Sequence, residues 1–339
     1  MKNLSLIFIS FLAVTQGFPQ SDSARFYFKK GTDEQTAKHY LVAAKYFDKA
    51  IQFDTKYTNA YIENGRVNLE MRKLDQAKLN FEKANQLQPT NEVAIEQLAT
   101  LYFNNRQFEK AIEFAQKCKS CQQSDKIIAM SNYNLEDYAK AIEGLKKALA
   151  KNPNDAEATY TLGRSYLEND DFKNAILQYQ KALAIDPTKN GWMYELGLQF
   201  YNTNDFANAK KYFLMAEDAG YPKSNDFYEN LGLAYMNTGD VDNGLKNLNI
   251  VLKRKPNDKE LLNDIAQALY TVKNYNQALS YYQTLLQLDP KNANALYMAG
   301  VTFQKMGQKE KGVAICDEAI KLDPSLAKNR QKKGDQFGL

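Results

Sequence analysis

The prolines of this chain recur at a nearly constant interval, and this spacing limits the possible folds more than any other feature. Seven of the eight are separated by 64, 34, 35, 34, 34 and 34 residues. They are Pro89, Pro153, Pro187, Pro222, Pro256, Pro290 and Pro324. Most follow a segment with helical apolar periodicity after a short polar step, and proline ends the helix that precedes it. A 34-residue period indicates an array of repeated helical units.

Two columns of small residues appear when the chain is aligned at this period. The first helix of each unit carries Gly31, Gly65, Ala99, Ala129, Gly163, Gly197, Gly232, Ala266 or Gly300. The second carries Ala43, Ala77, Ala111, Ala141, Ala175, Ala209, Gly244, Ala278 or Gly312. Bulky residues follow four positions later, as at Phe47, Phe81, Leu145, Tyr179, Phe213, Leu248 and Tyr282. Because a glycine inside a helix costs about 1 kcal/mol relative to alanine, this recurrence predicts close helix approach.

The pattern resembles the tetratricopeptide repeat over roughly residues 24 to 326. One unit shows it in Tyr61, Gly65, Ala77, Phe81, Ala84 and Pro89. The resemblance implies an all-α fold, a right-handed superhelical solenoid of about nine helical hairpins whose first helices line the inner wall. The expected units are 24–57, 58–91, 92–121, 122–155, 156–189, 190–224, 225–258, 259–292 and 293–326. The family hosts many partners, so the fold alone does not name one.

Three departures from the repeat affect the expected ends and one internal unit. The first unit has Glu34 in place of the usual aromatic residue and Thr55 in place of the usual proline, which favours a distorted N-terminal cap. The third unit, 92–121, is four residues short. Residues 327–339 are basic, and we expect them to form a solvated C-terminal cap or tail.

The N-terminus is typical of a secretory signal peptide at residues 1–17. Lys2 precedes a mostly apolar run, Leu4 to Val14, and small residues follow it up to Gly17. That run of eleven is shorter than the roughly 20 residues that span a bilayer, although a retained membrane anchor is the alternative. We expect cleavage near Gly17, a short linker at 18–23, and export to a bacterial periplasm or the exterior.

Composition and motifs favour no catalytic chemistry. The 44 basic and 40 acidic side chains leave a charge of +4, too slight to predict nucleic-acid binding. The single histidine, His39, lies at a polar helix start with no matching nucleophile motif. Three cysteines cannot form a four-cysteine zinc site, and no phosphate-binding glycine loop is present. Asp170 and Asp171 fit helix capping in a turn. We therefore expect no enzyme activity, cofactor or metal.

The motif from Cys118 to Cys121 is expected to close a helix, where the helix dipole raises a thiol pKa. A structural disulfide in an oxidising compartment is our preferred interpretation. Two reduced thiols and a redox-active pair are the alternatives. Cys316 falls in the bulky-residue column and is predicted to pack in the core.

An apolar stripe beside the hairpin core is the candidate binding surface. Its spacing of i, i+4 and i+7 places it along the first helices of successive units. The predicted residues are Tyr160, Arg164, Leu167, Tyr194, Leu198, Tyr201, Glu229, Leu233, Met236, Tyr270 and Tyr297. The alternative is that these side chains pack between neighbouring units. The Lys/Asn pattern with which some members of the family clamp a C-terminal carboxylate is not present.

These observations predict a non-catalytic protein–protein interaction scaffold of the cell envelope, which binds partner protein segments on the concave face. A regulatory or substrate-recruiting subunit of an envelope enzyme is the alternative. Direct binding of cell-wall glycan through the aromatic stripe is a third hypothesis.

Overall fold

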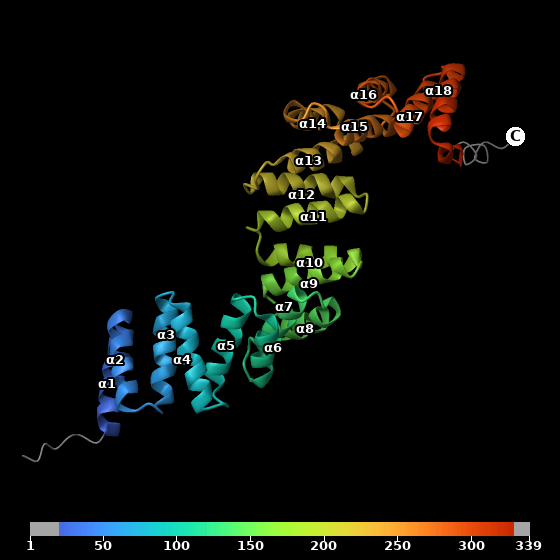
Figure 1. The fold of residues 1–339 in the computed structure, drawn as a ribbon. Coiled ribbons are helices and arrows are strands. Elements are labelled where there is room, and N and C mark those ends of the chain that lie inside the picture. Colours follow the sequence, from blue (N-terminus) through green and yellow to red (C-terminus); the bar gives the residue numbers. More distant parts are fainter. Residues whose placement is uncertain (1–19, 119, 329–339) are drawn as a thin grey trace, which may run out of the picture. The chain divides into compact units, whose positions relative to one another are not determined.

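The computed structural model describes residues 20–118 and 120–328 (Figure 1). Within them, eighteen α-helices pair into nine hairpins, which confirms the predicted all-α repeat fold. The predicted signal peptide, residues 1–17, and the tail beyond residue 328 lie outside the described residues. The first helix begins at Gln20, so residues 20–23 are helical where a linker was expected.

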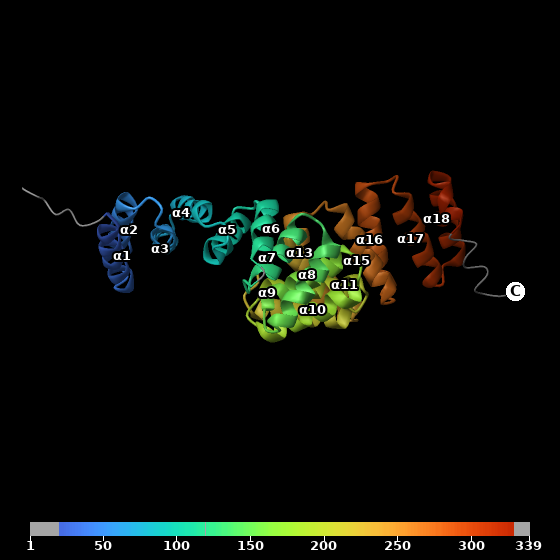
Figure 2. The ribbon, with the colours of Figure 1, turned by 90° about the horizontal axis from the view of Figure 1, so that it is seen from below.

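The chain divides into two compact units after Pro153. The N-terminal unit contains four hairpins. Its helices are α1 (Gln20–Thr36), α2 (Tyr40–Phe53), α3 (Thr58–Glu70), α4 (Leu74–Leu87), α5 (Glu92–Asn104), α6 (Phe108–Lys117), α7 (Ser124–Asn134) and α8 (Tyr138–Lys151). We number the hairpins 1 to 9 along the chain, so hairpin 1 is α1 with α2. Figure 2 shows that pair side by side at the blue end.

The C-terminal unit contains hairpins 5 to 9. Its helices are α9 (Ala156–Glu168), α10 (Phe172–Ile185), α11 (Asn190–Asn202), α12 (Phe206–Asp218), α13 (Asn225–Asn237), α14 (Val241–Arg254), α15 (Lys259–Thr271), α16 (Tyr275–Leu288), α17 (Ala293–Lys305) and α18 (Lys309–Leu322). A short 3₁₀ turn, η1 (Pro324–Leu326), follows α18 and buries Leu326.

Each hairpin turns through one residue in the left-handed conformation. Asn204 holds this position between α11 and α12, and the backbone N–H of Asp205 then donates to Phe200 O at 2.8 Å. The Asp205 side chain accepts from the backbone N–H of Asn208 at 3.2 Å and so caps the second helix. Asp171 caps α10 in the same way, as predicted. In the turns of the nine hairpins, the left-handed residues are Lys38, Arg72, Arg106, Glu136, Asp170, Asn204, Gly239, Lys273 and Gly307.

The glycine column marks close contact between the two helices of a hairpin. A Cβ atom on Gly197 would lie 2.6 Å from the ring of Phe213, closer than real Cβ atoms approach their neighbours. A Cβ on Gly65 would similarly lie 2.7 Å from Phe81. Cys316 is buried in this packing, as expected, and its Sγ lies 3.6 Å from Tyr297 O. The spacing of small and bulky residues therefore corresponds to real helix contacts.

Candidate protein-binding surface

The predicted stripe lies on the first helices of hairpins 5 to 9, and its members differ in accessibility. Four are buried: Tyr194, Leu233, Met236 and Tyr297. Seven are half-buried: Tyr160, Arg164, Leu167, Leu198, Tyr201, Glu229 and Tyr270. The stripe is therefore not a continuous exposed surface, and the buried positions require a correction.

Tyr194 packs between hairpins 6 and 7. Its ring stacks on Tyr221 with centroids 4.5 Å apart, and its hydroxyl accepts from Asn230 Nδ2 at 2.7 Å. Burial is the main cause of its raised pKa. With a relative exposure of 9%, this side chain holds neighbouring hairpins together. For Tyr194, the structure therefore favours the alternative interpretation, in which the side chain packs between neighbouring repeats.

Met236 belongs to the core of hairpin 7. It is fully buried, and its side chain fills the space opposite Gly244 on α14. A thioether enclosed in this way cannot contact a partner without unpacking the hairpin. The expectation that Met236 lies on an open surface is therefore wrong. Gly244 has no side chain, and Met236 occupies the space that this leaves inside the hairpin.

Tyr160 occupies the position in hairpin 5 that Tyr194 occupies in hairpin 6. Its hydroxyl donates to the Glu195 carboxylate, 2.7 Å from Oε2, and its ring stacks on Trp192 at 4.4 Å. Tyr179 donates to the same carboxylate at 3.2 Å. Aromatic stacking and a charge-assisted hydrogen bond thus join hairpin 5 to hairpin 6.

An open recess remains over α11, α13 and α15, with a volume of about 210 Å³. Its lining residues are Tyr201, Leu233, Asn237, Asp264, Gln267, Ala268 and Thr271. Tyr201 and Leu233 were predicted at this surface, whereas Asp264 was missed. The 34-residue alignment pairs Glu229 with Asn263 and Asp264 with Asn230, so the period gave no signal for Asp264.

Asp264 is the acidic residue that lines the recess, and Glu229 on α13 is near enough to feel its charge. Burial raises the pKa of Glu229, and the nearby carboxylates of Asp264 and Asp258 raise it further. Burial also raises the pKa of Asp264, with Glu260 and Asp258 adding to the shift. Both carboxylates lose hydration on folding and lie near other acidic groups, so positive charge is favoured in this part of the C-terminal unit.

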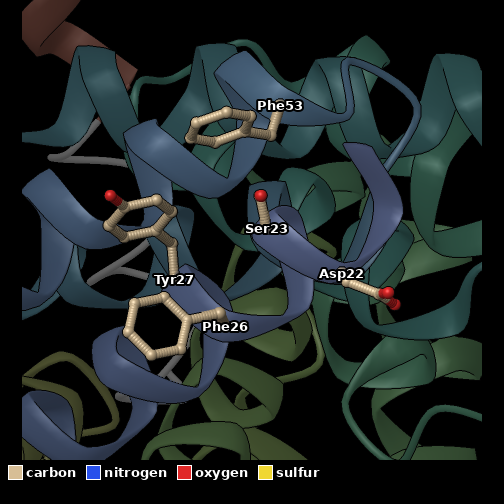
Figure 3. A pocket seen from close by; sticks show the side chains of 5 residues that line it. All are labelled: Asp22, Ser23, Phe26, Tyr27 and Phe53. Carbon is tan, nitrogen blue, oxygen red and sulfur yellow. The ribbon is translucent and has the colours of Figure 1, made fainter. Parts of the chain in front are cut away.

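A second hollow, of about 510 Å³, lies at the start of hairpin 1. Figure 3 shows the ring of Tyr27 between those of Phe26 and Phe53, and the rings of Tyr27 and Phe53 are stacked 5.4 Å apart. Phe26 is 55% exposed, and Lys30 Nζ lies 4.7 Å from its ring centroid.

Cys118 and Cys121 are joined in a disulfide, with Cα atoms 5.4 Å apart, immediately after the short helix α6. Both residues are buried. The hydroxyl of Ser124 donates to Cys118 O at 2.8 Å and ties this loop to the start of α7. This arrangement closes a helix, as the sequence indicated.

The remaining candidates for chemistry are dispersed. His39 lies 2.8 Å from Glu34 at the exposed start of α2. Across residues 20–118 and 120–328, the side chains of His, Cys, Asp and Glu form no group of three that could hold a metal. The helices within the same ranges are too short or too polar to cross a membrane.

Comparison with protein families identifies the repeat. Family models described as "Tetratricopeptide repeat" match residues 128–190, 194–259 and 269–329. The chain belongs to the tetratricopeptide-repeat family. A model described as "Anaphase-promoting complex, cyclosome, subunit 3" matches residues 70–148 of this tetratricopeptide-repeat protein.

Two curated relatives share part of the array. Anaphase-promoting complex subunit 3 of Schizosaccharomyces pombe is 26% identical over 148 residues, which are 41% of this chain and 22% of that protein. The Protein CTR9 homolog of Arabidopsis thaliana is 23% identical over 311 residues, 86% of this chain and 28% of that protein. The chain spans less than a third of the length of either relative.

Solved tetratricopeptide-repeat structures are also similar. YrrB, described as a TPR protein with an unusual peptide-binding site, is 26% identical, covers 57% of this chain and all of its own, and gives a TM-score of 0.42. The C-terminal part of a TPR repeat-containing protein from Cytophaga hutchinsonii is 22% identical. It covers 67% of this chain and 94% of its own, with a TM-score of 0.48.

Proposed function

We propose that this tetratricopeptide-repeat protein is a non-catalytic scaffold that binds a partner protein through the acidic recess of hairpins 6 to 8. The observation that carries the proposal is the half-buried carboxylate of Asp264 in the recess beside Tyr201 and Leu233, with the half-buried Glu229 close enough to act on both Asp264 and Tyr201 electrostatically. Desolvated like charges raise the free energy of the unbound protein, and a cationic partner group would lower it.

The chemistry of the recess favours a basic partner segment. A lysine or arginine side chain would place its charged end between the carboxylates and its aliphatic stem against the ring of Tyr201. Gln267 and Thr271 supply polar groups at the rim. We therefore expect a segment with a basic residue next to an apolar one, bound more weakly at high salt.

The test compares capture by matched variants. The double variant Glu229→Gln and Asp264→Asn keeps the shape of the recess and removes its charge, whereas Asp242→Asn on α14 is the control. Crosslinked complexes from the native host are quantified by mass spectrometry. A partner captured by the wild type and the control, but reduced at least tenfold with the double variant, supports the proposal. Equal capture by all three proteins would exclude the recess.

We also propose that the protein acts in the cell envelope after export. The support is the sequence of residues 1–17, which lies outside the described residues. Mass spectrometry of the protein from its native host should find a mature N-terminus between about Thr15 and Ser21. An intact Met1 would contradict removal of the signal.

A further inference from the structure

Two asparagines of hairpin 2 lie at its junction with hairpin 1, at two positions that are apolar in most later hairpins. Asn64 directly precedes Gly65, the small residue of its helix. At the equivalent position, the seven later hairpins carry Leu98, Ile128, Leu162, Leu196, Leu231, Ile265 and Ala299. Asn68 lies four positions further on, and its later counterparts are Tyr102, Asn132, Tyr166, Phe200, Tyr235, Leu269 and Phe303. Hairpin 2 thus carries amides where apolar side chains normally fill the junction.

Both amides are nine-tenths buried, with relative exposures of 3% for Asn64 and 6% for Asn68. They form the floor of a hollow of about 380 Å³ between α2 and α4. Its lining residues are Leu41, Ala44, Lys45, Asp48, Asn64, Asn68, Lys73, Gln76 and Asn80. This volume falls in the range of roughly 300–1,000 Å³ typical of ligand pockets.

Hydrogen bonds fix the orientation of the amides and leave part of their capacity unused. Asn64 Nδ2 donates to Asp48 Oδ1 at 2.7 Å. Asn68 Nδ2 donates to Asn64 O at 2.8 Å and to Asn64 Oδ1 at 3.0 Å. Within the described part of the chain, Asn68 Oδ1 accepts no hydrogen bond. One N–H of Asn64 and the carbonyl oxygen of Asn68 therefore form a donor and an acceptor at the floor, the pair that a peptide group requires.

The rim of the hollow is positive. Lys45 and Lys73 make no ion pair with any described residue, and Asp48 already accepts from Asn64. The lining thus carries two ammonium groups and one carboxylate that is already hydrogen-bonded, which favours negative charge in an occupant.

We infer that this hollow binds an extended, acidic peptide segment of a partner protein. Its main-chain N–H and C=O pair with the Asn68 oxygen and the Asn64 amide, and its carboxylates lie near Lys45 and Lys73. Asn68 Oδ1 has no partner in the described residues and is not among the fully buried polar atoms, so it is open to solvent in the hollow, where a peptide N–H can replace water. The site belongs to the N-terminal unit and does not depend on the recess of hairpins 6 to 8.

The test follows the Asn side-chain NMR signals of the full chain as capped peptides are added to millimolar concentration. The acidic probe is acetyl-Gly-Glu-Gly-Glu-Gly-amide, and the basic probe replaces each glutamate with lysine. The acidic probe is expected to shift the Asn64 and Asn68 signals with saturation, whereas the basic probe leaves them in place. No shift with the acidic probe, or an equal shift with both, would overturn the inference.

Variants separate binding from a structural role. Asn64→Leu with Asn68→Leu restores the apolar column, so it should abolish binding and raise the melting temperature by about 2–4 °C. Asn68→Ala should weaken binding at least tenfold. The matched control is Asn132→Leu, the same column in hairpin 4, which should leave binding unchanged. A lower melting temperature of the double variant, or binding that persists in it, would identify the amides as structural.

Discussion

The hydroxyl of Tyr160 donates a hydrogen bond to the carboxylate of Glu195, 35 residues later, across the junction of hairpins 5 and 6. One repeat further, Tyr194 accepts a hydrogen bond from Asn230 across the junction of hairpins 6 and 7. The first helices therefore use one position for contacts between repeats. Side chains two turns later, such as Tyr201, remain at the recess. The predicted stripe thus divides into a stabilising part and an accessible part.

Separate substitutions distinguish these parts. Tyr194→Ala should destabilise the C-terminal unit by about 3–5 kcal/mol, because it empties a buried aromatic position. Tyr201→Ala should cost less stability and should weaken partner capture at least tenfold, because its ring lines the recess. Urea unfolding and crosslinked capture measure the two effects. Equal losses of stability in both variants would contradict the division.

The acidic recess predicts a pH dependence of stability. Folding raises the pKa of Glu229 and of Asp264, so the folded chain binds more protons than the unfolded chain between the ordinary and the raised values. Each group therefore lowers the free energy of unfolding as the pH rises through that interval. The double variant Glu229→Gln and Asp264→Asn should gain stability over the wild type at neutral pH.

Thermal unfolding of the two proteins across pH checks this sign. The advantage of the variant should shrink as the pH falls below the raised pKa values, where the wild-type carboxyl groups are protonated. Asp242→Asn serves as the control and should show no such trend. An advantage that grows on acidification would contradict the prediction.

The cysteine pair makes a prediction about oxidation. Cys118 and Cys121 are joined in a disulfide after α6. We therefore expect one free thiol, that of Cys316, in each denatured, unreduced chain from the native host. Thiol titration with and without reductant measures the count, and Cys316→Ser should lower the unreduced value to zero. Three thiols before reduction would show that the pair is reduced.

The sequence predicted the hairpins because their contacts repeat within one 34-residue unit. Gly197 and Phe213, for example, lie in the same hairpin, and their spacing encodes their contact. Contacts between hairpins depend on the stacking of successive units, which the period does not specify. The burial of Tyr194 and the recess position of Asp264 therefore required coordinates. The importance of Asn64 likewise appeared only when its burial was known.

Two glycines in α11 test the packing argument within one helix. Gly197→Ala would place its Cβ 2.6 Å from the ring of Phe213 and 3.3 Å from Ala209 O, so the helices must separate. Overpacking of this kind costs about 1–3 kcal/mol. Gly191 has open space around its Cβ position, and Gly191→Ala should gain up to about 1 kcal/mol from helix propensity.

Hydrogen exchange shows where the damage from Gly197→Ala spreads. Because each repeat shares its core with its neighbours, exchange should rise first in hairpins 5 to 7 and later in hairpin 9. Gly191→Ala, the control in the same helix, should slow exchange in α11 or leave it unchanged. Uniform acceleration across the C-terminal unit with Gly197→Ala would mean that the five hairpins unfold as one cooperative core, and equal stability of the two variants would refute close approach at Gly197.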